Sequence, residues 1–208
     1  MIRVGGGLRC ATALLSVLCA CVIGTAVTPS PAQAGEGSIH CGVLVYGAIE
    51  DKYLSFGAQA GQLGCPLGQE AVAAAQGRWE AFRGGVIYWS PAPQIGAHVV
   101  WGAILDKWTQ YGREVGYGYP LTDELITPDR VGRYNHFQNG SIYWTLATGA
   151  HTVYGAIRDR WAAMGWERSC LGYPVGDETD TAGGGGRSQT FQRGSVYWTP
   201  AGGAHSTC

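Results

Sequence analysis

Apolar positions along the chain follow one arrangement that occurs three times. In each copy an isoleucine and an aromatic residue, such as Ile104 and Trp108, stand four positions apart after a Gly-Ala pair. This spacing places both side chains on one face of a helix. A glycine such as Gly112 follows, where a left-handed residue commonly ends a helix. The pattern predicts three short helices, and it assigns Tyr53, Trp108 and Trp161 to the core.

Short strand patterns follow each predicted helix. Residues 133–138 and 141–144 predict two strands around Asn139-Gly140, because Asn-Gly is the strongest two-residue hairpin signal. Residues 149–153 predict a third strand before the next helix begins. Between helix and hairpin stands a Gly-x-Pro loop, such as residues 118–120, which indicates a tight turn.

The whole unit recurs about every 54 residues, as the repeated Tyr-Trp pairs and phenylalanines show. Each copy has too few apolar positions for a core of its own, and such units gain stability by burying faces against neighbours. We therefore predict an α+β fold of three pseudo-symmetric repeats, each a short helix, a Gly-Pro loop and a small antiparallel β-hairpin. The predicted repeats are residues 47–101, 102–154 and 155–208, after a lead segment at 35–46.

The first residues predict an export signal. Arg3 and Arg9 stand at the start of a largely apolar or small-residue stretch, and residues 32–34 have the small-x-small form of a signal peptidase site. We predict a signal peptide over residues 1–34 and secretion of the remainder. An alternative stays open, because residues 18–21 resemble a lipobox that would make Cys21 the lipidated residue of a membrane-anchored lipoprotein.

Four cysteines follow the predicted cleavage site, and an even number in an exported protein predicts two disulfides. Cys41 precedes the first copy and Cys208 ends the third, so we predict one bond between them. A second bond is predicted between Cys65 and Cys170, which would join the same two copies. Together these bonds would close the three repeats into a ring. No C-x-x-C pair is present, which argues against a zinc or redox site.

The charge balance gives no reason to expect nucleic acid as a partner. The 208 residues include 14 Lys and Arg and 15 Asp and Glu, so no excess of positive charge attracts phosphates or an anionic membrane. A membrane partner is expected only if Cys21 is lipidated. The 34 glycines and 8 tryptophans exceed ordinary usage, and the tryptophans supply large flat surfaces for a core or for a ligand.

The Tyr-Trp pairs are the first candidates for ligand binding. Neighbouring residues of a strand point to opposite faces, so one ring can pack inward while the other faces out. An outward ring suits the apolar face of a sugar. The alternative is that both rings are buried between repeats. The candidates are Tyr88, Trp89, Tyr143, Trp144, Tyr197 and Trp198.

Two further residue types recur once in each copy. A glutamate after the loop proline can accept backbone N–H bonds or bind sugar hydroxyls. A histidine after Gly-Ala can fix a turn through its ring nitrogens, or could join its counterparts around a metal. Spacing alone supports a metal, so we predict none. These residues are Glu70, Glu124, Glu178, His98, His151 and His205.

Triplication argues against catalysis. An active site needs different residues in different roles within one asymmetric pocket, whereas three near-copies offer three near-identical sites. No nucleophile elbow, His-Glu-x-x-His or phosphate loop is present. Repeated sites suit a repetitive polymer, because linked weak sites raise avidity. We predict no catalytic residue and no cofactor.

The motif Leu-Gly-x-Pro…Glu…Phe…Gly-x-Ile-Tyr-Trp…Gly-Ala-His resembles the LGFP repeat of actinobacterial exported proteins, over residues 47–205. The phenylalanine of the name-giving tetrad is Cys65, Tyr119 or Tyr173 here, and its leucine is Tyr117 in the second copy. The resemblance implies a non-catalytic role in the cell envelope, with wall polysaccharide or another envelope polymer as partner. Two alternatives remain: a secreted esterase or glycoside hydrolase that uses the carboxylates and histidines, and a secreted protein-interaction or inhibitor module.

Overall fold

A computed structural model describes residues 37–208 of the chain. The predicted export signal and Cys21 lie outside these residues. Among the residues described, no helix is both long and apolar enough to cross a membrane.

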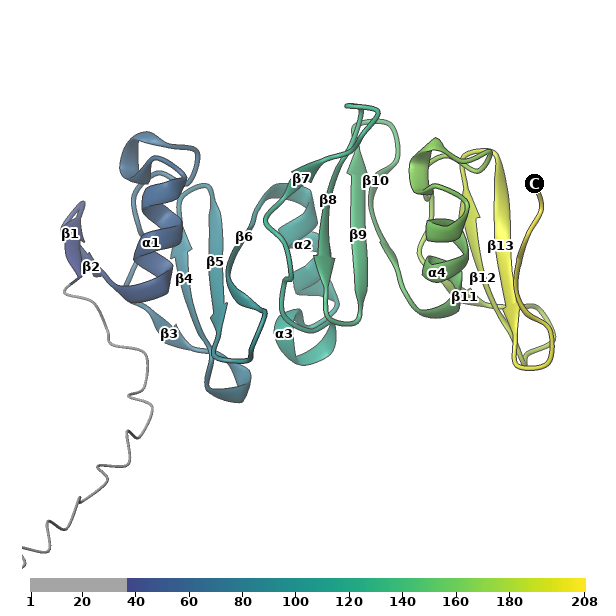
Figure 1. The fold of residues 1–208 in the computed structure, drawn as a ribbon, viewed down its shortest axis with the longest axis horizontal. Helices are drawn as coiled ribbons and strands as arrows, with labels where there is room; N and C mark the ends of the chain where they lie inside the picture. The colour runs from purple at the N-terminus through teal and green to yellow at the C-terminus, as the bar shows by residue number, and fades with distance from the viewer. Residues whose placement is uncertain (1–36) are drawn as a thin grey trace, which may run out of the picture. The chain divides into compact units, whose positions relative to one another are not determined.

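The fold is α+β and contains the same unit three times (Figure 1). We number the repeats 1, 2 and 3 with the ranges predicted above. Repeat 1 contains α1 (Gly47–Ser55), η1 (Ala58–Ala60), β3 (Ala71–Val72), η2 (Ala74–Gln76), β4 (Arg78–Phe82), β5 (Gly85–Ser90) and β6 (Gly96–Val100). Repeat 2 contains α2 (Gly102–Gln110), α3 (Arg113–Gly116), β7 (Leu125–Ile126), β8 (Arg133–Phe137), β9 (Gly140–Thr145) and β10 (Gly149–Val153). Repeat 3 contains α4 (Gly155–Ala163), η3 (Trp166–Arg168), β11 (Thr179–Asp180), β12 (Arg187–Phe191), β13 (Gly194–Thr199) and β14 (Gly203–Ser206).

Each repeat has a four-stranded antiparallel sheet, one strand more than the sequence predicts. The strand orders are β3-β4-β5-β6 in sheet 1, β7-β8-β9-β10 in sheet 2 and β11-β12-β13-β14 in sheet 3. The additional strand, β3, β7 or β11, has two residues and directly follows the loop glutamate. Two residues are too few to produce a period of two in the sequence, so pattern analysis misses this strand.

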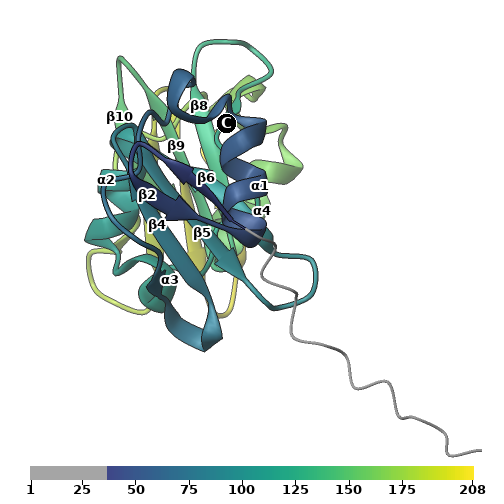
Figure 2. The same cartoon turned by 90° about the vertical axis from the view of Figure 1, so that its left-hand side faces the viewer.

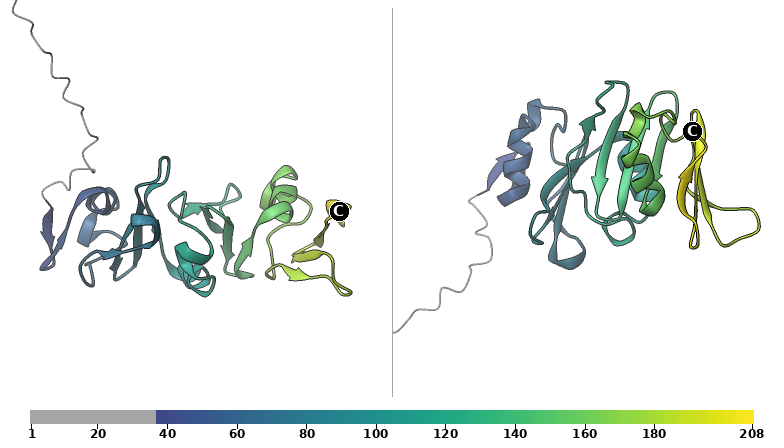
Figure 3. Two further views of the ribbon diagram at one scale, coloured as in Figure 1. Left: turned by 90° about the horizontal axis from the view of Figure 1, so that it is seen from below. Right: turned by 45° about the vertical axis from the view of Figure 1, so that its right-hand side comes forward.

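Helices and sheets alternate as layers. Helix α2 packs on β9 and β10 of its own sheet and also on β5 of the preceding one. Helix α4 packs in the same way on β13 and β14 and on β9. The right-hand view of Figure 3 shows α4, in green, between the strands of sheet 2 and the yellow strands of sheet 3. Helices α2 and α4 therefore each bury one side against their own sheet and the opposite side against the preceding sheet. This explains why a single repeat lacks a core of its own.

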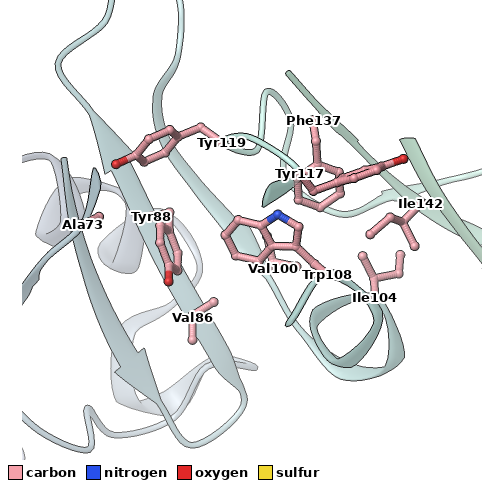
Figure 4. Packing of buried hydrophobic residues seen from close by; sticks show 10 residues of the cluster. All are labelled: Ala73, Val86, Tyr88, Val100, Ile104, Trp108, Tyr117, Tyr119, Phe137 and Ile142. Carbon is pink, nitrogen blue, oxygen red and sulfur yellow. The ribbon is translucent and has the colours of Figure 1, made fainter. Parts of the chain in front are cut away.

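The helix aromatic is the centre of each core, as predicted. Tyr53, Trp108 and Trp161 are fully buried, each in a separate hydrophobic cluster. Figure 4 shows Trp108 between Tyr88 of sheet 1 and Phe137 of sheet 2. Its indole N–H donates a hydrogen bond to the Gly118 carbonyl at 3.1 Å. Trp161 and Tyr53 make the equivalent bond to a loop glycine, so the aromatic residue also fixes the Gly-x-Pro loop.

The first helix is covered by an additional hairpin in place of a preceding sheet. Strands β1 (Ser38–His40) and β2 (Val43–Val45) pair antiparallel, and Figure 2 shows this hairpin, in purple, on the near side of the molecule. His40 reaches α1, where its Nε2 lies 3.2 Å from Glu50 and its ring packs edge-on against Tyr53. The lead segment is therefore part of the fold and closes the first core.

The disulfide pairing predicted from the sequence is wrong. Cys41 is bonded to Cys65, and Cys170 is bonded to Cys208. Cys41 lies in the turn of the β1–β2 hairpin, and that hairpin covers the first helix, so Cys41 comes close to the Gly-x-Pro loop of repeat 1. The first bond therefore ties the lead hairpin to repeat 1, and the second lies within repeat 3. Hydrogen bonds across repeat boundaries within residues 37–208 join repeat 1 to 2 and 2 to 3, and the cysteines give ring closure no support.

Candidate functional site

An arginine and a tryptophan face each other at the same place in every sheet. Each arginine begins the second strand of its sheet, and each tryptophan is the second member of a Tyr-Trp pair on the third strand. The register makes them direct partners, so their side chains lie on one face. The partners are Arg78 and Trp89, Arg133 and Trp144, and Arg187 and Trp198.

The glutamate after the loop proline pairs with this arginine. The Nε to Oε1 distance is 3.2 Å for Arg78 and Glu70 in repeat 1. The same distance is 3.9 Å in repeat 2 and 2.9 Å in repeat 3. The glutamate side chains are only 6–10% exposed, whereas the arginine side chains are 31–41% exposed. The pair therefore presents mainly its cationic partner to solvent.

Burial raises the pKa of Glu70, Glu124 and Glu178. Tyr46 offsets part of this effect for Glu70 and Trp101 for Glu124, and the facing arginine offsets part of it in every pair. The arginine matters because a buried carboxylate without a counter-charge would take up a proton. The ion pair thus keeps a hydrogen-bond acceptor and a donor fixed beside the tryptophan.

A fourth side chain comes from the residue before each Gly-Ala-Ile. Tyr46 donates a hydrogen bond from its hydroxyl to Glu70 at 3.1 Å. Tyr154 accepts one from Arg187 Nη2 at 3.0 Å. Trp101 has this place in repeat 2. We call the four residues together the Trp-Arg-Glu site: Tyr46, Glu70, Arg78 and Trp89; Trp101, Glu124, Arg133 and Trp144; Tyr154, Glu178, Arg187 and Trp198.

The first residues of each helix lie next to this site, and in repeats 2 and 3 they line it. The aromatic residue is the N-cap of its helix, and none of the three N-caps makes a side-chain capping bond. Helix N-caps are usually Ser, Thr, Asp or Asn, which satisfy the first N–H groups. In repeat 2 residues 102–104 line a cavity of about 230 Å³ together with Glu124, Arg133 and Trp144. In repeat 3 residues 155–157 line an equivalent cavity of about 250 Å³.

These cavities are smaller than the ~300–1,000 Å³ of a typical drug-sized site, so each has room for a single small ring. A tryptophan face, a cationic donor, a carboxylate acceptor and unpaired backbone donors surround that space. This set matches a polar ring that carries both hydroxyl groups and an apolar face.

The two members of each Tyr-Trp pair have different environments. Tyr88 and Tyr143 are buried, at 2% and 3% exposed, and each ring packs edge-on against the tryptophan of the next helix at 4.7 Å. Their neighbours Trp89 and Trp144 are half-buried, and Trp144 lines the cavity of repeat 2. In these two pairs one ring therefore packs inward, and the other remains partly exposed. Tyr197 is 38% exposed, because no further helix covers sheet 3 within the described residues.

The histidines lie at the boundaries between repeats, not in the Trp-Arg-Glu sites. Nδ1 of His98 is 3.4 Å from Asp123, and Nδ1 of His151 is 3.4 Å from Asp177. His205 is exposed and stacks on Tyr197. Nowhere in residues 37–208 do three His, Cys, Asp or Glu side chains gather as a metal-binding set.

Sequence reasoning named the glutamate and the tryptophan of each site, but it missed the arginine and the aromatic N-cap. A signal for both was present. Arg78, Arg133 and Arg187 recur with the same spacing as the Tyr-Trp pairs, and an aromatic residue precedes every Gly-Ala-Ile. A recurring charged residue on a strand facing a recurring tryptophan would have identified the pair.

The layered fold and its repeated site define a class of protein: a modular repeat protein in which every unit carries the same set of tryptophan, arginine and glutamate side chains. Comparison with family models narrows this class. The LGFP repeat model matches residues 63–116, 118–169 and 171–207. The chain therefore belongs to the LGFP repeat family. A search of curated proteins finds no match to the chain.

Proposed function

We propose that this chain is a non-catalytic binding protein that attaches to a polysaccharide of the bacterial cell envelope through its three Trp-Arg-Glu sites. One observation carries the proposal: tryptophan, arginine, glutamate and helix start recur together in all three repeats. A core needs no such charged pair beside a partly buried ring. A polymer with a repeating unit can use three copies.

The chemistry of the site suits a sugar ring. The tryptophan face can cover the apolar face of the ring, while the glutamate accepts hydrogen bonds from hydroxyls and the arginine donates to ring or hydroxyl oxygens. The arginine and glutamate are held by each other, so little side-chain freedom is lost when a sugar binds. Each site alone would bind weakly, and linkage of three would raise the apparent affinity.

The same ion pair disfavours hydrolysis. Glycoside hydrolases need two carboxyl groups about 5–10 Å apart, one of which must donate a proton. Among residues 37–208, the arginine of repeats 1 and 2 has one carboxylate partner. A second appears in repeat 3, where Asp180 accepts from Arg187 Nη1 at 2.5 Å. Asp180 is 80% exposed. A binding role needs no proton donor, and the arginine–glutamate pair that all three sites share is sufficient for it.

The location of the protein is part of the proposal. The predicted export signal and the two disulfides favour a secreted protein, because such bonds persist in oxidising compartments. Binding to wall polysaccharide would then keep the protein at the envelope without a membrane anchor.

Cosedimentation with purified actinobacterial cell walls tests this function. We expect the protein from residue 35 onward to sediment with walls, and Trp→Ala at 89, 144 and 198 together to abolish this. Single substitutions should weaken it in steps, because the sites act through avidity. Leu146→Ala is the matched control, since this side chain is 90% exposed and lies in the β9–β10 turn.

A second cosedimentation uses wall fractions from which the polysaccharide attached to the peptidoglycan has been removed, with the peptidoglycan itself intact. The comparison identifies the class of ligand. Loss of binding on stripping supports the proposal. A wild-type protein that stays in the supernatant, or a triple variant that folds and still sediments, overturns it. Release of sugars from the wall preparation would favour the hydrolase alternative.

A further inference from the structure

At the boundary between repeats 1 and 2, one aspartate is surrounded by three hydrogen-bond donors. Asp123 follows the loop proline of repeat 2 and accepts a hydrogen bond from Lys52 Nζ on α1 at 2.8 Å. It also accepts from the Val99 backbone N–H on β6 at 2.9 Å, and His98 Nδ1 lies 3.4 Å away. We call this arrangement a carboxylate joint: a Lys or Arg from the helix and a His and a backbone N–H from the last strand, all in one repeat, around an Asp of the next.

The boundary between repeats 2 and 3 has the same joint. Asp177 accepts from Lys107 Nζ at 2.9 Å and from the Thr152 backbone N–H at 3.0 Å. His151 Nδ1 is again 3.4 Å away. Hydrogen bonds from these groups outweigh the effect of burial and hold the pKa of both aspartates well below the usual range. Two independent copies therefore show that this donor set is built for a carboxylate.

Repeat 3 carries the same three donors. Arg160 takes the place of Lys52 and Lys107 on its helix, and His205 takes the place of the strand histidine. Ser206 pairs with Val196 in the register in which Val99 pairs with Ile87 and Thr152 with Ile142. The N–H of the following residue, Thr207, donates inward to Ser195. Because N–H groups alternate along a strand, that of Ser206 points outward.

Both charged or titratable side chains of this donor set are accessible. Arg160 and His205 are exposed, whereas their counterparts in the two joints are partly covered. Arg160 Nη2 donates to Ser206 Oγ at 3.3 Å, so its guanidinium already lies beside the last strand. Within residues 37–208 neither Arg160 nor His205 forms an ion pair with a carboxylate. Arginine in place of lysine strengthens the site, since a guanidinium binds a carboxylate through two parallel bonds.

We propose that Arg160, His205 and the Ser206 N–H form a binding site for an aspartate carboxylate, supplied by the Gly-x-Pro-x-x-Asp loop of a partner polypeptide. The two joints define this occupant, because in both the aspartate is the third residue after the loop proline, as in Pro120 and Asp123. A second copy of this chain fits poorly, since its first repeat has Gln69 at that position and its first helix is covered by the β1–β2 hairpin. This site is separate from the Trp-Arg-Glu sites and does not depend on the proposed function.

The surroundings of the site favour a polar contact. The outward face of sheet 1 carries Trp79, Ala81, Val86 and Val100, which pack under the next helix. The equivalent positions in sheet 3 are Ser188, Thr190, Ser195 and Thr207. These hydroxyl side chains keep the last sheet compatible with water. The partner loop is therefore recognised through its carboxylate, while Tyr197 remains as an exposed aromatic contact beside it.

A titration monitored by residue-resolved NMR tests the site. The probe is a peptide with the sequence of residues 118–124, Gly-Tyr-Pro-Leu-Thr-Asp-Glu, and its control replaces the aspartate by asparagine. We expect the aspartate peptide to shift the Ser206 amide and the His205 ring signals, and the asparagine peptide to bind about ten-fold more weakly. Arg160→Gln and His205→Ala should each weaken the aspartate peptide about ten-fold, whereas Arg168→Gln, an exposed arginine of the same repeat, should not.

Each other outcome counts against the site. Equal binding of both peptides, no shift at Ser206, or full affinity in Arg160→Gln overturns the proposal. Arg160→Lys separates binding from folding, because it keeps the charge found in the two joints and should retain most of the affinity. Glucuronate that shifts Ser206 as strongly as the aspartate peptide would assign the site to sugar acids and overturn the partner loop.

Discussion

Glu80 lies in β4 at the place that Asn135 occupies in β8, since each pairs with an isoleucine at the equivalent point of the neighbouring strand. Asn135 donates hydrogen bonds to the Val99 and Thr122 carbonyls at 3.1 and 3.0 Å. Glu80 is fully buried, and neither of its carboxyl oxygens has a hydrogen-bond partner among residues 37–208. A protonated carboxyl resembles an amide in shape and can donate one such bond. Repeat 1 therefore places an acid where its sister repeats use an amide.

Glu80→Gln is expected to stabilise the protein at neutral and alkaline pH. Burial and the nearby Glu70 raise the pKa of Glu80 to about 7. Tyr46 and Tyr53 also lie close to it. Below about pH 4.5 the folded and unfolded chains both hold this proton, so the residue adds no pH dependence. As the pH rises from about 4.5 to about 7, the ionisation of Glu80 lowers the free energy of unfolding. Above about pH 7 the full loss of about 3 kcal/mol is present.

Chemical denaturation at pH 4.5 and pH 8 measures this effect. The free energy of unfolding of Glu80→Gln should exceed that of the wild type by a few kcal/mol at pH 8 and by much less at pH 4.5. Asp106→Asn on the exposed side of α2 is the control and should change neither value. A difference between wild type and Glu80→Gln that is equal at both pH values contradicts the buried acid.

Asp123→Asn is expected to destabilise the boundary between repeats 1 and 2. Burial opposes ionisation of Asp123, but the hydrogen bonds from His98, Lys52 and Val99 prevail and hold its pKa at about 2. The folded value is below the unfolded value of about 3.8. The stabilisation, about 2 kcal/mol, is thus fully present above pH 4 and is lost as pH falls toward 2.

Denaturation of wild type and Asp123→Asn from pH 7 down to pH 2 tests the joint. Plotted against pH, the free energies of unfolding of the wild type and Asp123→Asn should converge near pH 2. Lys52→Gln added to Asp123→Asn should cost less than Lys52→Gln alone, since the pair is already broken. Additive losses would indicate that the contact between Lys52 and Asp123 contributes nothing to stability.

Tyr88→Ala and Tyr197→Ala are a matched pair, because both residues begin a Tyr-Trp pair at the same place in a sheet. Tyr88 is buried under α2, so its removal should cost about 3–5 kcal/mol. Within residues 37–208 no helix covers Tyr197, and its removal should cost below about 1 kcal/mol. Thermal or chemical unfolding of both variants measures the difference. Equal losses would mean that sheet 3 is covered in solution, by a partner or by a second copy.

The repeat, the helix stripe and the loops could be read from the sequence because they rest on local periods. Ile104 and Trp108 share a helix face whatever the tertiary fold around them, because they stand four positions apart. Asn139-Gly140 forms a tight turn through its own backbone preferences. The burial of Tyr88 required one more step, the stacking of a helix on the preceding sheet, which the alternation of faces already suggested.

The remaining features depend on contacts between distant segments. The partner of Cys41 follows from the β1–β2 hairpin, whose six paired residues have no repeated counterpart to reveal them. The ion pairs of Lys52 with Asp123 and of Lys107 with Asp177 cross repeat boundaries, so no spacing within one copy predicts them. The arginine of the Trp-Arg-Glu site differs from these, because its recurrence was visible and only its strand partner was missing.

Removal of the disulfides is expected to destabilise the two ends of the chain independently. The Cys41–Cys65 bond spans 24 residues and the Cys170–Cys208 bond spans 38, and each is expected to contribute about 3 kcal/mol. The first bond joins the lead hairpin to repeat 1 and the second lies within repeat 3, so repeat 2 separates them. Replacing either pair by serine should therefore lower the free energy of unfolding by a similar amount, and replacing both should give the sum. Chemical denaturation of the three variants measures this, with Asp106→Asn again as the neutral control. A double loss much smaller than the sum would indicate that the two ends are coupled, as a closed ring requires.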